Sequence, residues 1–131
     1  MVQISTVRTG MIGETAVVHD ITKNYDFNIY TTVCDDRGCD LVVERRKKDF
    51  VRVQVKTITS VNRNTSVEVR LKKYINKDLI DIVAVYYQPK DIIAYIPYDN
   101  QTSINLALKG AKNKQKKFRH YFYQYMEFPV E

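Results

Sequence analysis

Residues 39–58, CDLVVERRKKDFVRVQVKTI, decide the fold because they hold a pair of strand patterns joined by a polar turn. Both patterns are rich in β-branched and apolar residues, and we expect a tight turn near residues 47–49. The second strand alternates, with Val53, Val55 and Thr57 on one face and Arg52, Gln54, Lys56 and Ile58 on the other. An antiparallel hairpin places Asp40, at the start of its first strand, beside the end of its second strand.

One helix and several further strands surround this hairpin in the predicted fold. Residues 11–27 carry apolar side chains at helical spacing, which predicts a helix with Gly13 and Glu14 in its first turns. Strand patterns occupy residues 27–34, 66–74, 77–89 and 91–99, and residues 102–108 form a short strand or helix. This order predicts an α/β or α+β protein, with one mixed sheet and a helix packed on it.

Length and composition limit the class of protein. A chain of 131 residues, 44% hydrophobic and 27% charged, is typical of one globular domain spanning residues 1–131. No apolar run approaches the roughly 20 residues that span a bilayer, and the N-terminus lacks the apolar region of a secretory signal, so we expect no membrane partner. The sequence holds 2 cysteines, Cys34 and Cys39, which match no zinc pattern. We therefore expect reduced thiols and an intracellular, cytoplasmic protein.

The positive charge is concentrated in particular segments. The formal net charge is +6, and the C-terminal segment 108–120 contains basic residues with no acid among them. Those residues are Lys109, Lys112, Lys114, Lys116, Lys117 and Arg119. Residues 44–52 form a second, smaller basic cluster. Such clusters permit contact with a polyanion, and they are equally typical of a solvated tail and a charged hairpin turn.

The open end of the hairpin is the candidate site. It gathers Asp40, Gln54 and Lys56, and Glu14 would join them if the helix packs on the same face. Carboxylate and amide oxygens suit Mg²⁺, and the backbone carbonyl of Val55 is a candidate third ligand. A bound cation lowers the pKa of water and stabilises charge on a phosphate, and a lysine orients or deprotonates that water. The pattern therefore favours metal-dependent phosphodiester hydrolysis.

A purely structural interpretation of these residues also exists. Asp40 would cap a turn, and Gln54 and Lys56 would lie on the wet face of a hairpin. Glu14 near a helix N-terminus is favourable through the helix dipole alone.

The motifs GET, CDLVVE and VRVQVKT together resemble the PD-(D/E)XK nuclease superfamily. The Q-V-K version is most similar to the group I intron-encoded homing endonucleases of cyanobacterial transfer RNA introns. By position, Asp40 matches the central aspartate, Gln54 the variant acid, Lys56 the lysine and Glu14 the helical glutamate. Cys39 replaces the proline of the family name. The resemblance covers roughly residues 10–58, with a continuation through DIVAVYYQPKDIIAYIP.

This resemblance implies an α/β, restriction-endonuclease-like core, with a mixed sheet of four or five strands flanked by helices. It implies sequence-specific double-strand DNA cleavage with Mg²⁺ or Mn²⁺ by a homodimer or homotetramer associated with the nucleoid. The alternatives are a Holliday junction resolvase, a restriction or repair nuclease, a non-catalytic DNA-binding protein and a structural interaction module. Residues 118–128, rich in Tyr and Phe, suit either a subunit interface or the core.

DNA contacts are expected from basic and amide side chains that follow the catalytic strand or lie in the C-terminal segment. These are Asn62, Arg63, Asn64, Arg70, Lys72, Lys73, Lys112, Lys114, Lys116 and Lys117.

Overall fold

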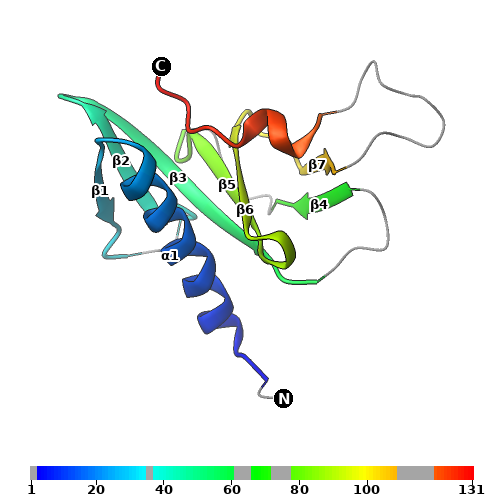
Figure 1. Cartoon of the computed structure of the whole chain (residues 1–131). Coiled ribbons are helices and arrows are strands. Elements are labelled where there is room, and N and C mark those ends of the chain that lie inside the picture. Colours follow the sequence, from blue (N-terminus) through cyan, green and yellow to red (C-terminus); the bar gives the residue numbers. More distant parts are fainter. Residues whose placement is uncertain (1–2, 35–36, 61–65, 72–77, 109–119) are drawn as a thin grey trace.

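The computed structural model describes residues 3–34, 37–60, 66–71, 78–108 and 120–131 (Figure 1). The elements in chain order are α1 (Thr6–Asn24), β1 (Asn28–Thr31), β2 (Leu41–Arg46), β3 (Asp49–Ile58), β4 (Ser66–Arg70), β5 (Ile82–Tyr87), η1 (Gln88–Lys90), β6 (Ile92–Pro97), β7 (Ser103–Ala107) and η2 (Phe122–Tyr125). No helix in the described ranges is long and apolar enough to cross a membrane. Neither Cys34 nor Cys39 takes part in a disulfide bond, and the Cys39 thiol donates to the Leu41 carbonyl at 3.4 Å.

The main sheet is mixed. Its 5 strands run in the order β1-β2-β3-β5-β6, and a second sheet pairs β4 with β7. Among the described strands of the two sheets, β3 and β5 pair in parallel, and the other neighbouring strands pair antiparallel. The predicted mixed sheet with a helix on one face is confirmed, and residues 103–107 form a strand rather than a helix.

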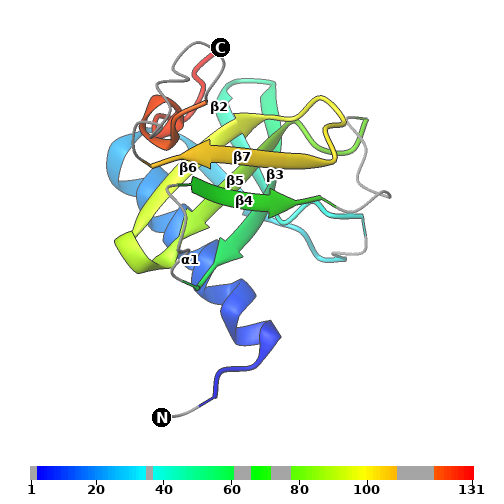
Figure 2. The same cartoon turned by 90° about the vertical axis from the view of Figure 1, so that its right-hand side faces the viewer.

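The described elements form layers on either side of the main sheet. On one face, Val17 and Ile21 of α1 pack against Val53 of β3 in a continuous core. On the other face, β4 and β7 cover a second core that contains Val83 and Val85 of β5. Figure 2 shows β4 and β7 in front of the main sheet with α1 behind it. The sheet is therefore flanked by an α-helix on one face and by a small sheet on the other.

The β2–β3 hairpin forms where the sequence predicts it. Arg46 pairs with Asp49, and Lys48 adopts the left-handed backbone conformation, with φ 67°, that the short turn needs. Arg45 donates two hydrogen bonds to the Asp49 carboxylate across the turn, from Nε to Oδ2 at 2.9 Å and from Nη2 to Oδ1 at 3.0 Å. Hydrogen bonds from Arg45 hold the pKa of the Asp49 carboxyl below its usual range.

Helix α1 begins earlier than the sequence indicates. Ser5 caps it, accepting the N–H of Arg8 on its hydroxyl, and the helix runs to Asn24. Glu14 therefore lies in the middle of the helix, and the expectation that it stands near a helix N-terminus is wrong. The helix dipole acts mainly in the terminal turns, so it gives no separate reason for a glutamate here.

The aromatic C-terminal segment belongs to the core. Phe122 and Phe128 are only 1% and 2% exposed. The Phe128 ring contacts Tyr25, Phe27 and Tyr95, and its N–H donates to the Tyr25 hydroxyl at 2.8 Å. Of the predicted alternatives for residues 118–128, the described part supports the core, with η2 as its only regular element.

Candidate active site

Strand β3 places apolar side chains on one face of the main sheet and polar side chains on the other. Val53 lies in the core beneath α1, and Val55 packs against that same core. Gln54 and Lys56 alternate to the opposite face, where they pair in register with Val83 and Val85 of β5. The predicted pairing of Gln54 and Lys56 on one face is therefore present.

Asp40 is held at the point where β2 begins. Its N–H donates to the Val53 carbonyl at 2.9 Å, and its carboxylate oxygen Oδ2 accepts the N–H of Val55 at 2.7 Å. The Val55 N–H thus donates to a side chain, whereas in a regular antiparallel pair of strands it would donate to a backbone carbonyl of the neighbouring strand. The Thr32 hydroxyl fixes the preceding residue by donating to the Cys39 carbonyl at 2.8 Å. Asp40 consequently lies beside residues 53–55 of β3, as the hairpin prediction required.

Gln54 is the buried polar residue of this site. It is 7% exposed, and its oxygen Oε1 has no hydrogen-bond partner among the described residues. Leaving a buried acceptor unpaired costs about 1–3 kcal/mol. Gln54 lies between Val53 and Val55, whose backbones hydrogen-bond to Asp40, so its unpaired amide oxygen is a candidate to accept a ligand from outside the chain.

The backbone of Val55 adds another oxygen on the same edge of β3. The N–H and C=O of one strand residue point to the same side, and the Val55 N–H points to Asp40. The Val55 carbonyl therefore also faces the β2 side of the strand. Lys56 follows directly and is half-buried.

Glu14 approaches from the other side of the main sheet. Its neighbour Gly13 packs so closely on β3 that a Cβ there would lie 1.9 Å from Thr57 Oγ1 and 3.2 Å from Val55 Cγ1. The condition for Glu14 to join the site directly, a helix packed on the face of Gln54 and Lys56, is not met, because α1 covers the face of Val55 and Thr57. A contribution of Glu14 around the edge of β3 or through a bridging water stays a prediction.

An ion pair that sequence reasoning missed adjoins the site. Arg52, which precedes Gln54 on the same face of β3, holds Asp81 with Nε to Oδ2 and Nη2 to Oδ1 distances of 3.0 Å. Burial raises the pKa of the Asp81 carboxyl, but hydrogen bonds from the Arg52 side chain and backbone outweigh it and lower the pKa. The partners are 29 positions apart, so no local pattern links them.

Most of the predicted DNA contacts fall outside the described residues. Arg70 is described: it lies on β4 with an 88% exposed side chain, 3.6 Å from Glu68. The others lie in residues 61–65, 72–77 and 109–119, outside the described ranges: Asn62, Arg63, Asn64, Lys72, Lys73, Lys112, Lys114, Lys116 and Lys117.

The donor set fits a hard divalent cation that keeps several waters. Asp40 supplies a carboxylate, Gln54 a buried oxygen without a partner, and Val55 a carbonyl on the same edge. Within the described residues, no group of three or more His, Cys, Asp or Glu side chains is placed to hold a metal. The residues therefore fit an open site for a cation such as Mg²⁺ and do not fit a closed cage of protein ligands.

Residues 4–128 match the family of PD-(D/E)XK endonucleases, so the chain belongs to that family and is a nuclease that acts on DNA. Nucleases of this family use divalent metal ions, typically Mg²⁺. No curated protein matches the chain.

Among solved structures, the chain is similar to a bacterial homing endonuclease, I-Ssp6803I. The match has a TM-score of 0.72 at 19% sequence identity and covers 94% of this chain and 87% of that chain. At this identity the similarity shows the fold, and the predicted restriction-endonuclease-like α/β core is confirmed.

Proposed function

We propose that this protein is a Mg²⁺-dependent, sequence-specific double-strand DNA endonuclease of the homing type, encoded within an intron. The observation that carries the proposal is the buried, unpaired side-chain oxygen of Gln54, which lies between the two β3 residues that hydrogen-bond to Asp40, in a chain of the nuclease family. The similarity in fold to a bacterial homing endonuclease supports the homing type. Such an enzyme works on chromosomal DNA, which places it at the nucleoid.

Each residue of the site has a proposed role. Asp40, Gln54 and the Val55 carbonyl hold Mg²⁺ or Mn²⁺, and Glu14 contributes through a water. When bound, the cation lowers the pKa of the attacking water and stabilises charge on the phosphate. Lys56 orients or deprotonates that water, or donates a hydrogen bond to the developing oxyanion.

DNA binding and assembly complete the proposal. Arg70 and the basic and amide residues outside the described ranges contact phosphates and base edges. Cutting both strands of a duplex requires a second active site, so the working enzyme is a homodimer or homotetramer.

Cleavage of a diverse duplex DNA library tests this function. The wild-type protein is expected to cut with Mg²⁺ at one recurring long site, and Lys56→Ala is expected to bind that site without cutting it. Lys23→Ala, an exposed lysine near the end of α1, is the matched control and keeps full activity. Cutting restricted to branched DNA would replace the proposal with a junction resolvase. Binding without cutting under either metal would leave a non-catalytic binding protein.

A further inference from the structure

The N-terminal part of α1 extends beyond the main sheet. At Gly13 a Cβ would lie 1.9 Å from Thr57 Oγ1, whereas at Gly10, one turn earlier, a Cβ would meet nothing within 4 Å. Figure 1 shows this end of α1 passing the edge of the sheet toward the N-terminus. We call residues 4–11 the α1 overhang.

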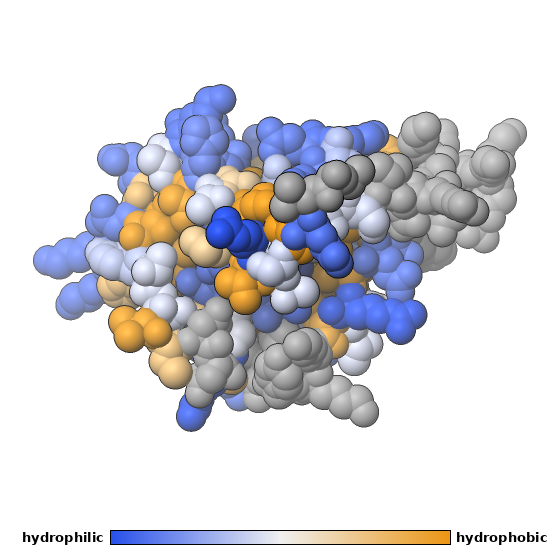
Figure 3. Space-filling model, turned by 90° about the horizontal axis from the view of Figure 1, so that it is seen from below, coloured by the Kyte–Doolittle hydropathy of each residue, from blue (hydrophilic) through white to orange (hydrophobic). Residues whose placement is uncertain are grey.

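The α1 overhang exposes apolar side chains. Ile4, Val7 and Met11 are 51%, 74% and 58% exposed. Val7 and Met11 are four positions apart, so they lie on the same side of the helix. Figure 3 looks at this end of the molecule, where hydrophobic patches lie open between hydrophilic ones. Short helical segments are marginal in water without packing, and exposed apolar side chains gathered at one end of a helix are a candidate contact surface for a partner.

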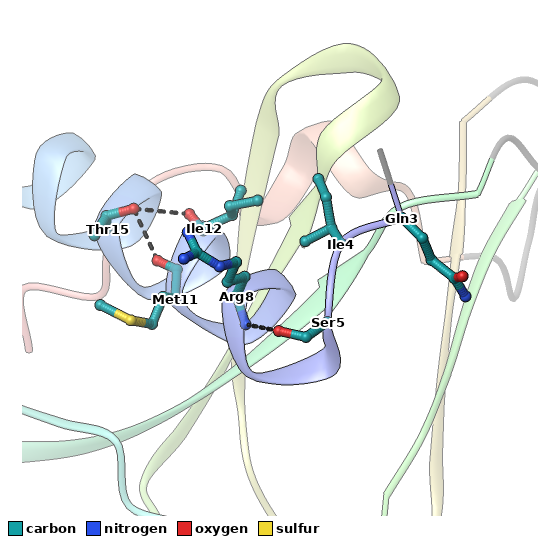
Figure 4. Close-up of a pocket in the computed structure, with 7 residues that line it drawn as sticks. All are labelled: Gln3, Ile4, Ser5, Arg8, Met11, Ile12 and Thr15. Atoms are coloured by element: carbon teal, nitrogen blue, oxygen red, sulfur yellow. Dashed lines mark hydrogen bonds between the residues drawn. The ribbon is translucent and has the colours of Figure 1, made fainter. Parts of the chain in front are cut away.

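A hollow lies beside the α1 overhang, lined by apolar and polar side chains. Ile4, Arg8 and Ile12 contribute to its lining (Figure 4). The Thr15 hydroxyl donates to the Met11 carbonyl at 2.8 Å, and the Ser5 hydroxyl accepts the N–H of Arg8 at 3.3 Å. The Ser5 and Thr15 hydroxyls are thus engaged within the helix, and the apolar side chains of Ile4, Met11 and Ile12 form much of the lining beside the polar Gln3 and Arg8.

The charge of the chain points to a second copy as the partner. The net charge is +6, so two copies repel each other over most of their surface. Among residues 3–13, only Arg8 is charged. This low charge resembles the centre of a protein interface, where charged residues are depleted and Met is enriched. The aromatic C-terminal segment is a weaker candidate, because Phe122 and Phe128 are buried within one copy.

We propose that the α1 overhang is the surface through which two copies of this chain associate, with Ile4, Val7 and Met11 of each copy packed against the other. The overhang adjoins Gly13, which packs against Thr57 on the α1 side of the main sheet, opposite the face that carries Gln54 and Lys56. The proposal rests on the exposure and the low charge of the overhang and does not depend on the proposed function.

Sedimentation velocity of the full chain tests whether two copies associate through the α1 overhang. The measurement is made without DNA or metal and over a range of protein concentrations. The wild type is expected to sediment as a dimer or a multiple of it. Val7→Lys/Met11→Lys is expected to be monomeric with an unchanged far-UV circular dichroism spectrum, since Lys is a good helix former. Tyr123→Lys is the matched control, 66% exposed on η2, and keeps the wild-type mass. A monomeric wild type, or a double variant with the wild-type mass, would overturn the proposal.

Cysteine cross-linking provides a second test that does not depend on weakening the contact. Met11→Cys in a Cys34→Ser background is expected to form a disulfide-linked dimer under mild oxidation, because the Met11 side chains meet. Lys23→Cys, on the exposed far end of the same helix, is expected to remain monomeric under the same conditions. Equal cross-linking of both variants, or none at Met11→Cys, contradicts the proposal. Neither test involves cleavage, so a dimer that cuts no DNA would refute the proposed function and leave this surface standing.

Discussion

At the scale of single residues, Gln54 is the feature that distinguishes a functional site from an ordinary hairpin. A surface glutamine satisfies its amide with water, whereas Gln54 is 7% exposed and its oxygen is unpaired among the described residues. Buried polar groups are usually hydrogen-bonded, and exceptions occur at sites that bind ligands or ions. Proteins accept the loss of stability that an unpaired buried oxygen brings where the oxygen is needed for function.

Replacing Gln54 by Leu is therefore predicted to stabilise the metal-free protein while abolishing cleavage. Replacing the buried amide, whose oxygen is unpaired, by an apolar group of similar size is expected to raise the free energy of unfolding by about 1–3 kcal/mol. Urea unfolding with and without Mg²⁺ measures this, and Mg²⁺ is expected to stabilise only the wild type.

Gln101→Leu is the control for this substitution. Gln101 accepts the Asp99 N–H at 2.6 Å and donates to the Pro97 carbonyl at 3.2 Å, so its loss is expected to destabilise. If Gln54→Leu lowers the free energy of unfolding as much as Gln101→Leu does, the Gln54 amide stabilises the fold and the prediction is wrong.

At the scale of elements, the sequence predicts what is local and periodic. The β2–β3 hairpin follows from alternation and a polar turn, and it brings Asp40 to β3. The start of α1 was missed because the first turns lie beyond the sheet and carry no core-facing apolar stripe. The face that α1 covers, and hence the route from Glu14 to the site, depends on tertiary packing and not on spacing.

The two glycines of α1 are predicted to respond in opposite directions to Ala. Gly13→Ala forces a Cβ against Thr57 and is expected to lower the free energy of unfolding by about 1–3 kcal/mol. Gly10→Ala meets open space and is expected to raise it by about 0.5–1 kcal/mol through helix propensity. Thermal or urea unfolding of the wild type and of each variant measures the two changes in the free energy of unfolding.

Thr57→Ala added to Gly13→Ala removes the hydroxyl that the new Cβ meets, so it is expected to recover part of the lost stability. Equal effects of Gly10→Ala and Gly13→Ala would show that α1 does not press on β3 at this point.

The Arg52–Asp81 pair is predicted to make stability depend on acid pH. The pKa of Asp81 is lowered in the fold, so its contribution is present above the unfolded value of about 3.9 and is lost as pH falls through the folded value. Both side chains are more than a third exposed, so we expect less than about 1 kcal/mol. Urea unfolding of the wild type and Asp81→Asn near pH 7 and near pH 3 measures it: the difference between the proteins is expected to shrink at the lower pH. A difference that stays constant would exclude this pair as the cause.

At the scale of the whole molecule, the main sheet separates the packing of α1 from the face that carries Gln54 and Lys56. The helix, its overhang and the associated core lie on one side, and the candidate cation ligands lie at the edge and on the far side of β3. The proposed metal site and the proposed dimer surface therefore lie on different sides of the main sheet and do not compete for the same residues.

The central claim is that Asp40, Gln54 and Lys56 form a metal-dependent nuclease site, and single-turnover cleavage of a duplex target by Asp40→Asn tests it most directly. An asparagine oxygen still accepts the Val55 N–H, so the hairpin is kept while the carboxylate charge is lost. We predict unchanged unfolding, unchanged DNA binding and a cleavage rate reduced by at least about 100-fold, consistent with the loss of a group that stabilises the transition state. Wild-type cleavage rates in Asp40→Asn, or wild-type cleavage that persists when all divalent metal is chelated, would contradict the account.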